Sequence, residues 1–451
     1  MSRRVAVSQT ANAAKLAEKI TFPTSKRIAK NRFMKAALTE RVATWDPNDR
    51  KKCGFPTPGL CNMYEKFSHG GFGVLLSGNV VVDPIHLESA GNVIIHKSVD
   101  SAERREAFKR YAAAFKSGPD NLAILQLSNA GRQTPLALAE HPIGASNIQL
   151  NAIRRGSGFG KPRALTTEEV KDVVVEDFAY AAKYAFDAGF DGVQIHSAHG
   201  YLLAQFISET TNNRTDKYGG TLENRTRLNL EIYEAIRRLV PVSTGFVVGI
   251  KMNSKEFQAG GLECEDAIYM CKEYERVGFD FIELSGGTIE KLAFQHLTES
   301  TINREAFFFE FAAKIKAALS TIIVYLTGGF RTVNGMVFAI EQGACDGIGL
   351  GRPITSELDL PSKIISGQVQ SALFNPWDQD FGISNFASGT QMWQAQQTPY
   401  NPETDINNGI MDISDPETAE KYKIALQSYN AKCTELAQAG IPLHGVFEYQ
   451  S

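Results

Sequence analysis

The chain has 451 residues, of which 43% are hydrophobic and 22% are charged, and its formal net charge is −3 at pH 7. This composition is typical of a globular protein, and the weakly acidic balance disfavours a nucleic-acid partner. No apolar run approaches the roughly 20 residues that cross a bilayer, so we expect no membrane segment.

Eight short apolar runs alternate with helical patterns along the first 365 residues. Each run is too short for a helix and suits a strand that is buried on both faces. The expected strands are residues 33–37, 74–77, 122–127, 192–196, 247–252, 281–285, 322–327 and 347–351. The clearest helical patterns between them are residues 101–116, 168–187, 222–239, 266–277 and 305–319.

The connections between the expected helices and strands follow a regular pattern. Helical patterns end in a glycine such as Gly189 or Gly278, which adopts the left-handed conformation at no cost, and a strand follows within a few residues. Asp100 with Glu103 and Thr166 with Glu169 resemble capping boxes at helix starts. Alternating strands and helices predict a (β/α)₈ barrel over residues 1–370. A doubly wound open sheet is the rival fold, but no G-x-G-x-x-G follows the first strand.

Residues 371–451 form a C-terminal extension of different character. Residues 374–408 are rich in Gln, Asn, Pro and aromatics without a clear period, so we expect irregular chain there. Asp415 and Pro416 then open a helix with one apolar stripe, which Gly440 ends. The stripe consists of Tyr422, Leu426, Tyr429, Cys433 and Leu436. We expect it to pack on the barrel or on a second copy of the chain in a homo-oligomer.

The six cysteines include no C-x-x-C pair, which disfavours zinc and iron–sulfur sites. In a chain of this length, unpaired thiols are typical of a reducing compartment. We therefore expect a cytoplasmic protein.

The candidate chemistry lies after the fourth strand, because barrel enzymes carry their sites at the C-terminal strand ends. His196, His199 and Tyr201 emerge there together. Two imidazoles and a phenol can hold a carbonyl oxygen and protonate a nearby carbon. A metal pair is the alternative reading of the imidazoles, but the nearest acid downstream, Glu209, has no evident geometry for a third ligand.

Glycines follow the seventh and eighth strands at Gly328, Gly329 and Gly351, and Arg352 comes next. These two loops are the usual phosphate site of such barrels, since glycines let backbone N–H groups approach an anion and an arginine adds donors. Tight turns without a ligand are the alternative interpretation.

Gln126 and Lys251 are expected to point into the barrel from the third and fifth strands. A buried Gln suits the edge of an imide-like ring, and a buried Lys needs a negative partner. Reduced flavin would satisfy both residues. A salt bridge between Lys251 and a barrel carboxylate is the alternative.

Long motifs then identify a family. The run HSAHGYLLAQF at residues 196–206, continued by NRTDKYGG at 213–220 and LENR at 222–225, resembles the old yellow enzyme family of FMN-dependent ene-reductases. NRFMKAALT at 31–39, QLSNAGR at 126–132 and GRP at 351–353 resemble the family's first strand, third strand and phosphate end. The resemblance covers residues 15–365.

The resemblance implies a role for each matching residue. Thr39 would bind flavin O4, Gly78 would let the backbone approach the ring, and Gln126 would hold the pyrimidine edge. The backbones at 328–329 and 351–352 would hold the phosphate. Ala37 stands where the family has Pro, Asn129 where it has His, and Lys251 where it has Arg, which replaces a fork of donors by a point charge.

The implied reaction is reduction of an activated C=C bond by an FMN-dependent ene-reductase. NADPH or NADH would reduce the flavin, His196 and His199 would bind the oxygen of a small-molecule enone or enal, and Tyr201 would protonate its α-carbon. Three alternatives stay open: an iron–sulfur relative that reduces dienoyl thioesters or demethylates amines, a hydride-return isomerase, and a flavin-binding protein without turnover. The loops at 133–162 and 288–304 are expected to shape the pocket.

Overall fold

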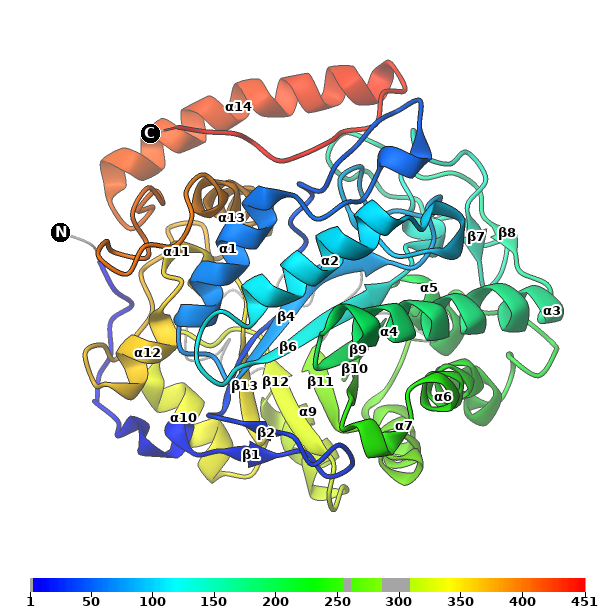
Figure 1. Ribbon diagram of the computed structural model, residues 1–451, viewed down its shortest axis with the longest axis horizontal. Coiled ribbons are helices and arrows are strands. Elements are labelled where there is room, and N and C mark those ends of the chain that lie inside the picture. The colour runs from blue at the N-terminus through cyan, green and yellow to red at the C-terminus, as the bar shows by residue number, and fades with distance from the viewer. Residues whose placement is uncertain (1–2, 255–260, 286–308, 451) are drawn as a thin grey trace.

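The computed structural model describes residues 3–254, 261–285 and 309–450, and its centre is a closed barrel of parallel strands (Figure 1). This confirms the (β/α)₈ prediction. Pairing of β3 with β4 closes the ring, and a short outer strand, β5 (Val93–Ile94), extends from β4. The strands lie in the order β3 (Phe33–Lys35), β13 (Gly347–Leu350), β12 (Ile323–Thr327), β11 (Phe281–Ser285), β10 (Val247–Asn253), β9 (Gly192–Ser197), β6 (Leu122–Ser128) and β4 (Val74–Val81).

Helices surround the barrel, where they pack on its outer face and on one another. In chain order they are α1 (Pro58–His69), α2 (Ala102–Phe115), α4 (Glu176–Ala188), α6 (Leu222–Leu239), α7 (Cys264–Val277), α9 (Phe309–Ala317), α10 (Val333–Glu341) and α12 (Leu360–Ile365). Residues 286–308, which include part of one expected helix and the expected 288–304 pocket loop, lie outside the described residues.

One of the two expected capping boxes is present in the structure and the other is not. Thr166 and Glu169 form one at α3 (Thr167–Glu169), which leads through a π-helix (Val170–Val175) into α4. The expected box at Asp100 is wrong, because Ser101 caps α2 by accepting a hydrogen bond from the Arg104 amide. The Asp100 carboxylate instead binds the Arg105 guanidinium at 2.6 Å.

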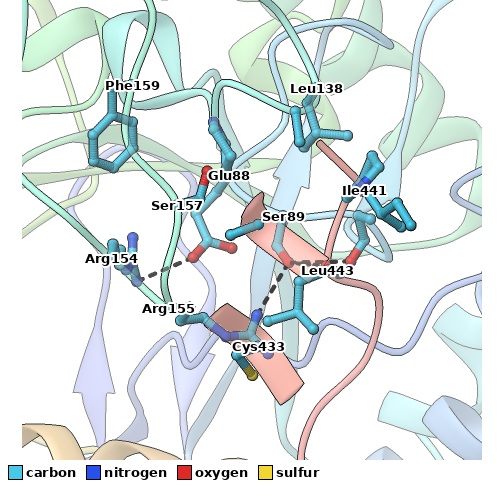
Figure 2. A pocket seen from close by; sticks show the side chains of 15 residues that line it. Glu88, Ser89, Leu138, Arg154, Arg155, Ser157, Phe159, Cys433, Ile441 and Leu443 are labelled. Atoms are coloured by element: carbon cyan, nitrogen blue, oxygen red, sulfur yellow. Dashed lines mark hydrogen bonds and ion pairs between the residues drawn. The ribbon is translucent and has the colours of Figure 1, made fainter. Parts of the chain in front are cut away.

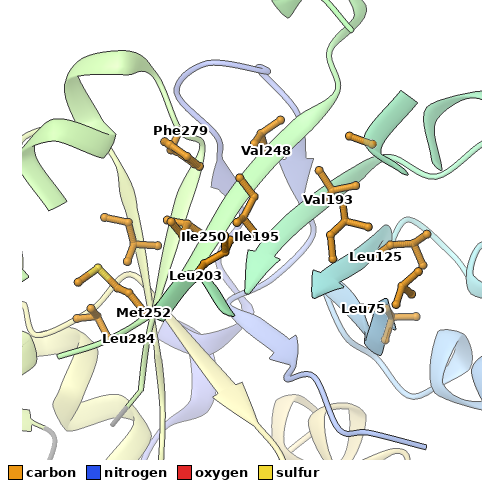
Figure 3. Close-up of a cluster of buried hydrophobic side chains, with 14 of the residues drawn as sticks. Leu75, Leu125, Val193, Ile195, Leu203, Val248, Ile250, Met252, Phe279 and Leu284 are labelled. Carbon is orange, nitrogen blue, oxygen red and sulfur yellow. The ribbon is translucent and has the colours of Figure 1, made fainter. Parts of the chain in front are cut away.

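Side chains alternate between the two faces of each strand, as the pleat requires. Outward-facing Leu75, Val193 and Ile250 belong to the large core between barrel and helices (Figure 3). Inward-facing residues near the strand starts form a separate apolar floor, which includes Leu76, Val247 and Tyr325, and the hairpin of β1 (Ile20–Thr21) and β2 (Ile28–Ala29) packs against it. The interior becomes polar toward the C-terminal strand ends, and this gradient places the site there.

The C-terminal extension carries two helices, α13 (Phe381–Gln396) and α14 (Pro416–Gln438). In Figure 1, α14 crosses one edge of the molecule with α13 between it and α1. The stripe of α14 packs on its own chain, where Tyr422 and Leu426 join Trp377 and Ala387 in one cluster. Helix α13 lies where irregular chain was expected, because it buries Ser, Thr and Gln residues and therefore shows no apolar period.

No helix in the described ranges is both long and apolar enough to cross a membrane.

Candidate active site

Three aromatic side chains meet at the C-terminal end of β9. His196 is the penultimate residue of the strand, and its ring centroid lies 5.4 Å from that of His199 and 4.7 Å from that of Tyr201. His199 and Gly200 have φ angles of 58° and 75°, so the chain turns sharply through the left-handed region. This turn brings the predicted catalytic residues together.

His199 is fixed by three other elements. Its Nε2 lies 2.9 Å from the Ser285 hydroxyl at the end of β11, and its amide donates to Asn253 at the end of β10. The side chain of Gln133 donates to its carbonyl at 2.6 Å. The imidazole orientation is therefore set before any ligand arrives.

The protonation states suit hydrogen-bond and proton donation. Burial, reinforced by nearby cationic side chains such as Lys251, lowers the pKa of His199 to about 3, and burial next to His199 holds the pKa of His196 well below its usual value. Both imidazoles are thus neutral at physiological pH, and each keeps one N–H. Burial, with the Glu88 charge, raises the pKa of Tyr201, so the phenol keeps its proton.

A chain of polar contacts crosses the barrel interior below these rings. The Gln126 amide donates to Gln194 at 2.7 Å, the Gln194 amide donates to Glu283 at 2.7 Å, and Lys251 Nζ lies 3.0 Å from Glu283 Oε1. The alternative proposed for Lys251, a barrel carboxylate, is therefore present. Within the described chain, Glu283 Oε1 accepts no well-aligned hydrogen bond, so this contact is an ion pair rather than a fixed hydrogen bond.

Three predicted flavin residues lie near the end of β3. Ala37 and Thr39 are half-buried just beyond that strand. Gly78 in β4 donates its amide to the Glu40 carboxylate at 2.8 Å, and a Cβ at this position would lie 1.9 Å from Glu40 Oε2. Glycine is thus required at position 78 by Glu40, whatever else approaches the backbone.

The glycine loops form an open cradle after β12 and β13. Gly328 and Gly329 have φ angles of 150° and 80°, and a Cβ at Gly351 would meet nothing nearer than Leu38 Cδ2 at 3.6 Å. The buried Thr327 hydroxyl at the end of β12 has no hydrogen-bond partner in the described residues. Exposed backbone and an orphaned hydroxyl fit a phosphate-bearing cofactor.

Arg352 points away from this cradle. Its guanidinium donates to Ser384 of α13 at 2.8 Å and lies 3.8 Å from the Asp378 carboxylate. The expected fork of phosphate donors therefore faces the extension, and the peptide backbone at 351–352 is what borders the cradle.

Some residues of the site escaped the sequence analysis. Gln194 and Glu283 lie in runs read as apolar. Gln194 is two residues before His196 and so shares its face, which is a signal that could have found it, whereas no predicted site residue lies two positions from Glu283. Glu209 binds Arg225 at 2.8 Å rather than approaching the imidazoles. Among described residues, no group of three His, Cys, Asp or Glu side chains is arranged to hold a metal.

The fold and site define an FMN-binding barrel oxidoreductase, and comparison with known proteins gives the family. Residues 24–370 match the NADH:flavin oxidoreductase / NADH oxidase family. The NADH-dependent flavin oxidoreductase nadA of Aspergillus parasiticus is 40% identical over 390 residues, 86% of either chain.

Solved structures share the fold. The old yellow enzyme homologue of Zymomonas mobilis superposes with a TM-score of 0.66 at 22% identity, over 88% of this chain and 99% of that one. Morphinone reductase in complex with tetrahydroNAD gives a TM-score of 0.62 at 22% identity, over 79% and 91% of the two chains.

The chain therefore belongs to the NADH:flavin oxidoreductase / NADH oxidase family, which confirms the relationship to the old yellow enzymes. It is an NAD(P)H-dependent oxidoreductase with FMN as cofactor.

Proposed function

We propose that the protein is an ene-reductase that uses NADH to reduce the activated C=C bond of α,β-unsaturated ketones or aldehydes. The observation that carries the proposal is the cluster of two neutral imidazoles and one protonated phenol at the end of β9. NADH is favoured over NADPH because the curated relative at 40% identity is named as NADH-dependent.

The donor set of the site would hold the flavin. Thr39, Gln126 and Lys251 provide polar groups for the ring, and Ala37 and Gly78 flank it. The backbones of Gly328, Gly329, Gly351 and Arg352 provide N–H groups for the phosphate. When bound, FMN supplies hydride transfer at N5.

The remaining chemistry belongs to the chain. His196 and His199 each donate one hydrogen bond to the substrate carbonyl oxygen, where negative charge grows as the β-carbon receives hydride. Tyr201 gives its proton to the α-carbon and becomes a phenolate, which solvent reprotonates. Fixed imidazoles stabilise the growing charge without reorganising: Ser285, Asn253 and Gln133 hold His199, and the Ala198 amide donates to Nδ1 of His196.

Stopped-flow spectroscopy of Tyr201→Phe tests this assignment. Flavin reduction by NADH should be unchanged, whereas reoxidation by 2-cyclohexenone should slow by roughly 10²- to 10⁴-fold, the usual contribution of a general acid. Tyr180→Phe is the matched control, because that phenol on α4 binds Asp100 away from the site.

Reoxidation of Tyr201→Phe at the wild-type rate would remove Tyr201 from the mechanism. Reduced wild-type enzyme that enones fail to reoxidise would favour a hydride-return isomerase or a flavin-binding protein without turnover. Cytoplasmic location and self-association remain predictions.

A further inference from the structure

Strand β4 contains a bulge where it borders the candidate flavin site. The register of β4 on β6 shifts between the pairs Leu76–Ile124 and Asn79–Gln126, so two residues of β4 stand opposite one residue of β6. Inside the bulge, the backbone amide of Gln126 donates to the Ser77 hydroxyl at 2.9 Å. A β-bulge of this kind changes the direction of the side chains that follow it.

The bulge turns the side chain of Asn79 into the barrel. Leu76 faces inward, so regular alternation would place Asn79, three residues later, on the outer face. The extra residue reverses this, because paired residues of neighbouring parallel strands face the same side and Gln126 points into the barrel. The next residue, Val80, accordingly belongs to the core between barrel and helices. Asn79 therefore lies on the inner face beside Gln126.

The side-chain amide of Asn79 has an unused donor in this position. Only 4% of the residue is exposed, and its Nδ2 has no hydrogen-bond partner within residues 3–254, 261–285 and 309–450. Buried polar groups nearly always have a partner, because an unpaired one costs free energy on folding. An apolar side chain would suit folding better here, so the amide indicates a ligand that accepts its hydrogen bond.

We propose that Asn79 is a further cofactor-binding residue, whose side-chain amide donates a hydrogen bond to a carbonyl oxygen of the pyrimidine ring of FMN. Strand β4 pairs with β3, which Thr39 follows, and with β6, which carries Gln126. An inward donor on β4 thus lies between the two side chains expected to bind the ring. The proposal rests on the flavin site of the proposed function and is independent of the substrate that is reduced.

A donor at this place should affect the two redox states of the cofactor unequally. Reduction by hydride increases the negative charge of the pyrimidine ring, and a hydrogen bond to a charged acceptor is stronger than one to a neutral acceptor. Asn79 should therefore bind reduced FMN more tightly than oxidised FMN, which raises the midpoint potential of the bound cofactor.

The test measures FMN affinity and midpoint potential in Asn79→Leu and Asn79→Ala. Both variants remove the donor, whereas only the first nearly keeps the volume of the side chain. Flavin fluorescence should show about two- to tenfold weaker binding of oxidised FMN, the worth of a neutral hydrogen bond. Reduced FMN should lose about tenfold more, which lowers the midpoint potential of the two-electron couple by about 30 mV in a reductive titration with a reference dye.

Thermal unfolding of the FMN-free protein is a readout that a structural role would move in the opposite direction. Asn79→Leu removes an unpaired buried donor, so its Tm should rise by about 1–3 °C. A residue retained for folding would instead lower Tm when replaced. Higher stability without the cofactor, combined with weaker cofactor binding, is expected only of a residue that serves the ligand.

Asn92→Leu is the matched control. Asn92 is as buried as Asn79, at 2% exposure, but its side chain accepts from the Ser89 amide at 2.9 Å and donates to Glu88 at 3.5 Å. Ser89 and Glu88 line a separate small cavity against the end of α14 (Figure 2). The control should lower Tm and leave FMN affinity and midpoint potential at their wild-type values.

Gln126→Leu separates this proposal from the flavin site on which it rests. If Gln126→Leu weakens FMN binding while both Asn79 variants match Asn92→Leu in affinity and potential, the flavin site stands and the role of Asn79 is wrong. If neither Gln126→Leu nor the Asn79 variants change FMN binding, both assignments are wrong. A lower Tm in Asn79→Leu with an unchanged midpoint potential would also overturn the proposal. No enone enters these measurements, so they do not depend on ene-reductase activity.

Discussion

Replacing Glu283 by Gln should destabilise the protein strongly, because it leaves the Lys251 ammonium buried without a counter-charge. The side chain of Glu283 is 0% exposed and that of Lys251 5% exposed, and their charged atoms lie 3.0 Å apart. Removing one partner of such a pair costs about 3–5 kcal/mol. The loss of stability cannot exceed the free energy of removing the proton from the lysine, because the buried ammonium can become a neutral amine instead. For a lysine of ordinary pKa that free energy is about 4.6 kcal/mol at pH 7 and about 2 kcal/mol at pH 9.

Urea unfolding followed by circular dichroism measures this loss. We expect Glu283→Gln to lose about 3–4.6 kcal/mol at pH 7 and at most about 2 kcal/mol at pH 9. The matched control is Asp187→Asn, which breaks an exposed pair with Lys183 of 2.5 Å, whose side chains are 39% and 41% exposed. That change should cost less than about 1 kcal/mol at either pH.

The reasoning fails if Glu283→Gln loses no more stability than Asp187→Asn. It fails equally if the stability lost in Glu283→Gln is not smaller at pH 9 than at pH 7. An unpaired buried ammonium becomes neutral by losing its proton at high pH, whereas a packing defect does not depend on pH in this way.

Three further outcomes follow from the site and its surroundings. His199→Asn should fold, since Asn tolerates the φ of 58°. Burial lowers the pKa of His199 to about 3, so on acidification the unfolded chain takes up this proton before the folded one does, and the stability of the wild type falls as the pH falls. The variant lacks this imidazole and should therefore lose less stability than the wild type between pH 6.5 and pH 5. Gly351→Ala should leave thermal unfolding of the FMN-free protein unchanged, because only Leu38 at 3.6 Å meets the new methyl. It should weaken FMN binding by about tenfold or more, measured by flavin fluorescence, because the methyl occupies the cradle expected to hold the phosphate. Arg104→Lys should lower stability by roughly 3 kcal/mol in urea titrations, because the fully buried guanidinium donates to four backbone carbonyls that an ammonium cannot reach together.

The barrel and the strand that carries the candidate site could be predicted because their signals are local. A glycine that ends a helix, such as Gly189, and the apolar run after it specify one β-α unit, and eight repeats specify the closure. The cluster at His196, His199 and Tyr201 lies within six residues, so a single strand end brings it together.

What could not be predicted depends on contacts between distant residues. The partner of Lys251 is 32 positions away on another strand, and nothing near Glu283 in the sequence marks it as that partner. Arg154 lies in a loop without period, and the turn at residues 155–156 precedes no motif that would reveal its partner, Glu88. Helix α13 is buried through small and polar residues, so the rule that apolar stripes mark helices does not apply to it.

The polar contacts inside the barrel also constrain how the protein can change. Gln126, Gln194, Glu283 and Lys251 touch in series across four strands, so a substitution at one end alters what the other end can tolerate. Exchanging Lys251 for arginine would first require Glu283 to find a new position. We expect these four positions to behave as one epistatic unit, and libraries that aim to alter the flavin's surroundings should vary them jointly rather than one at a time.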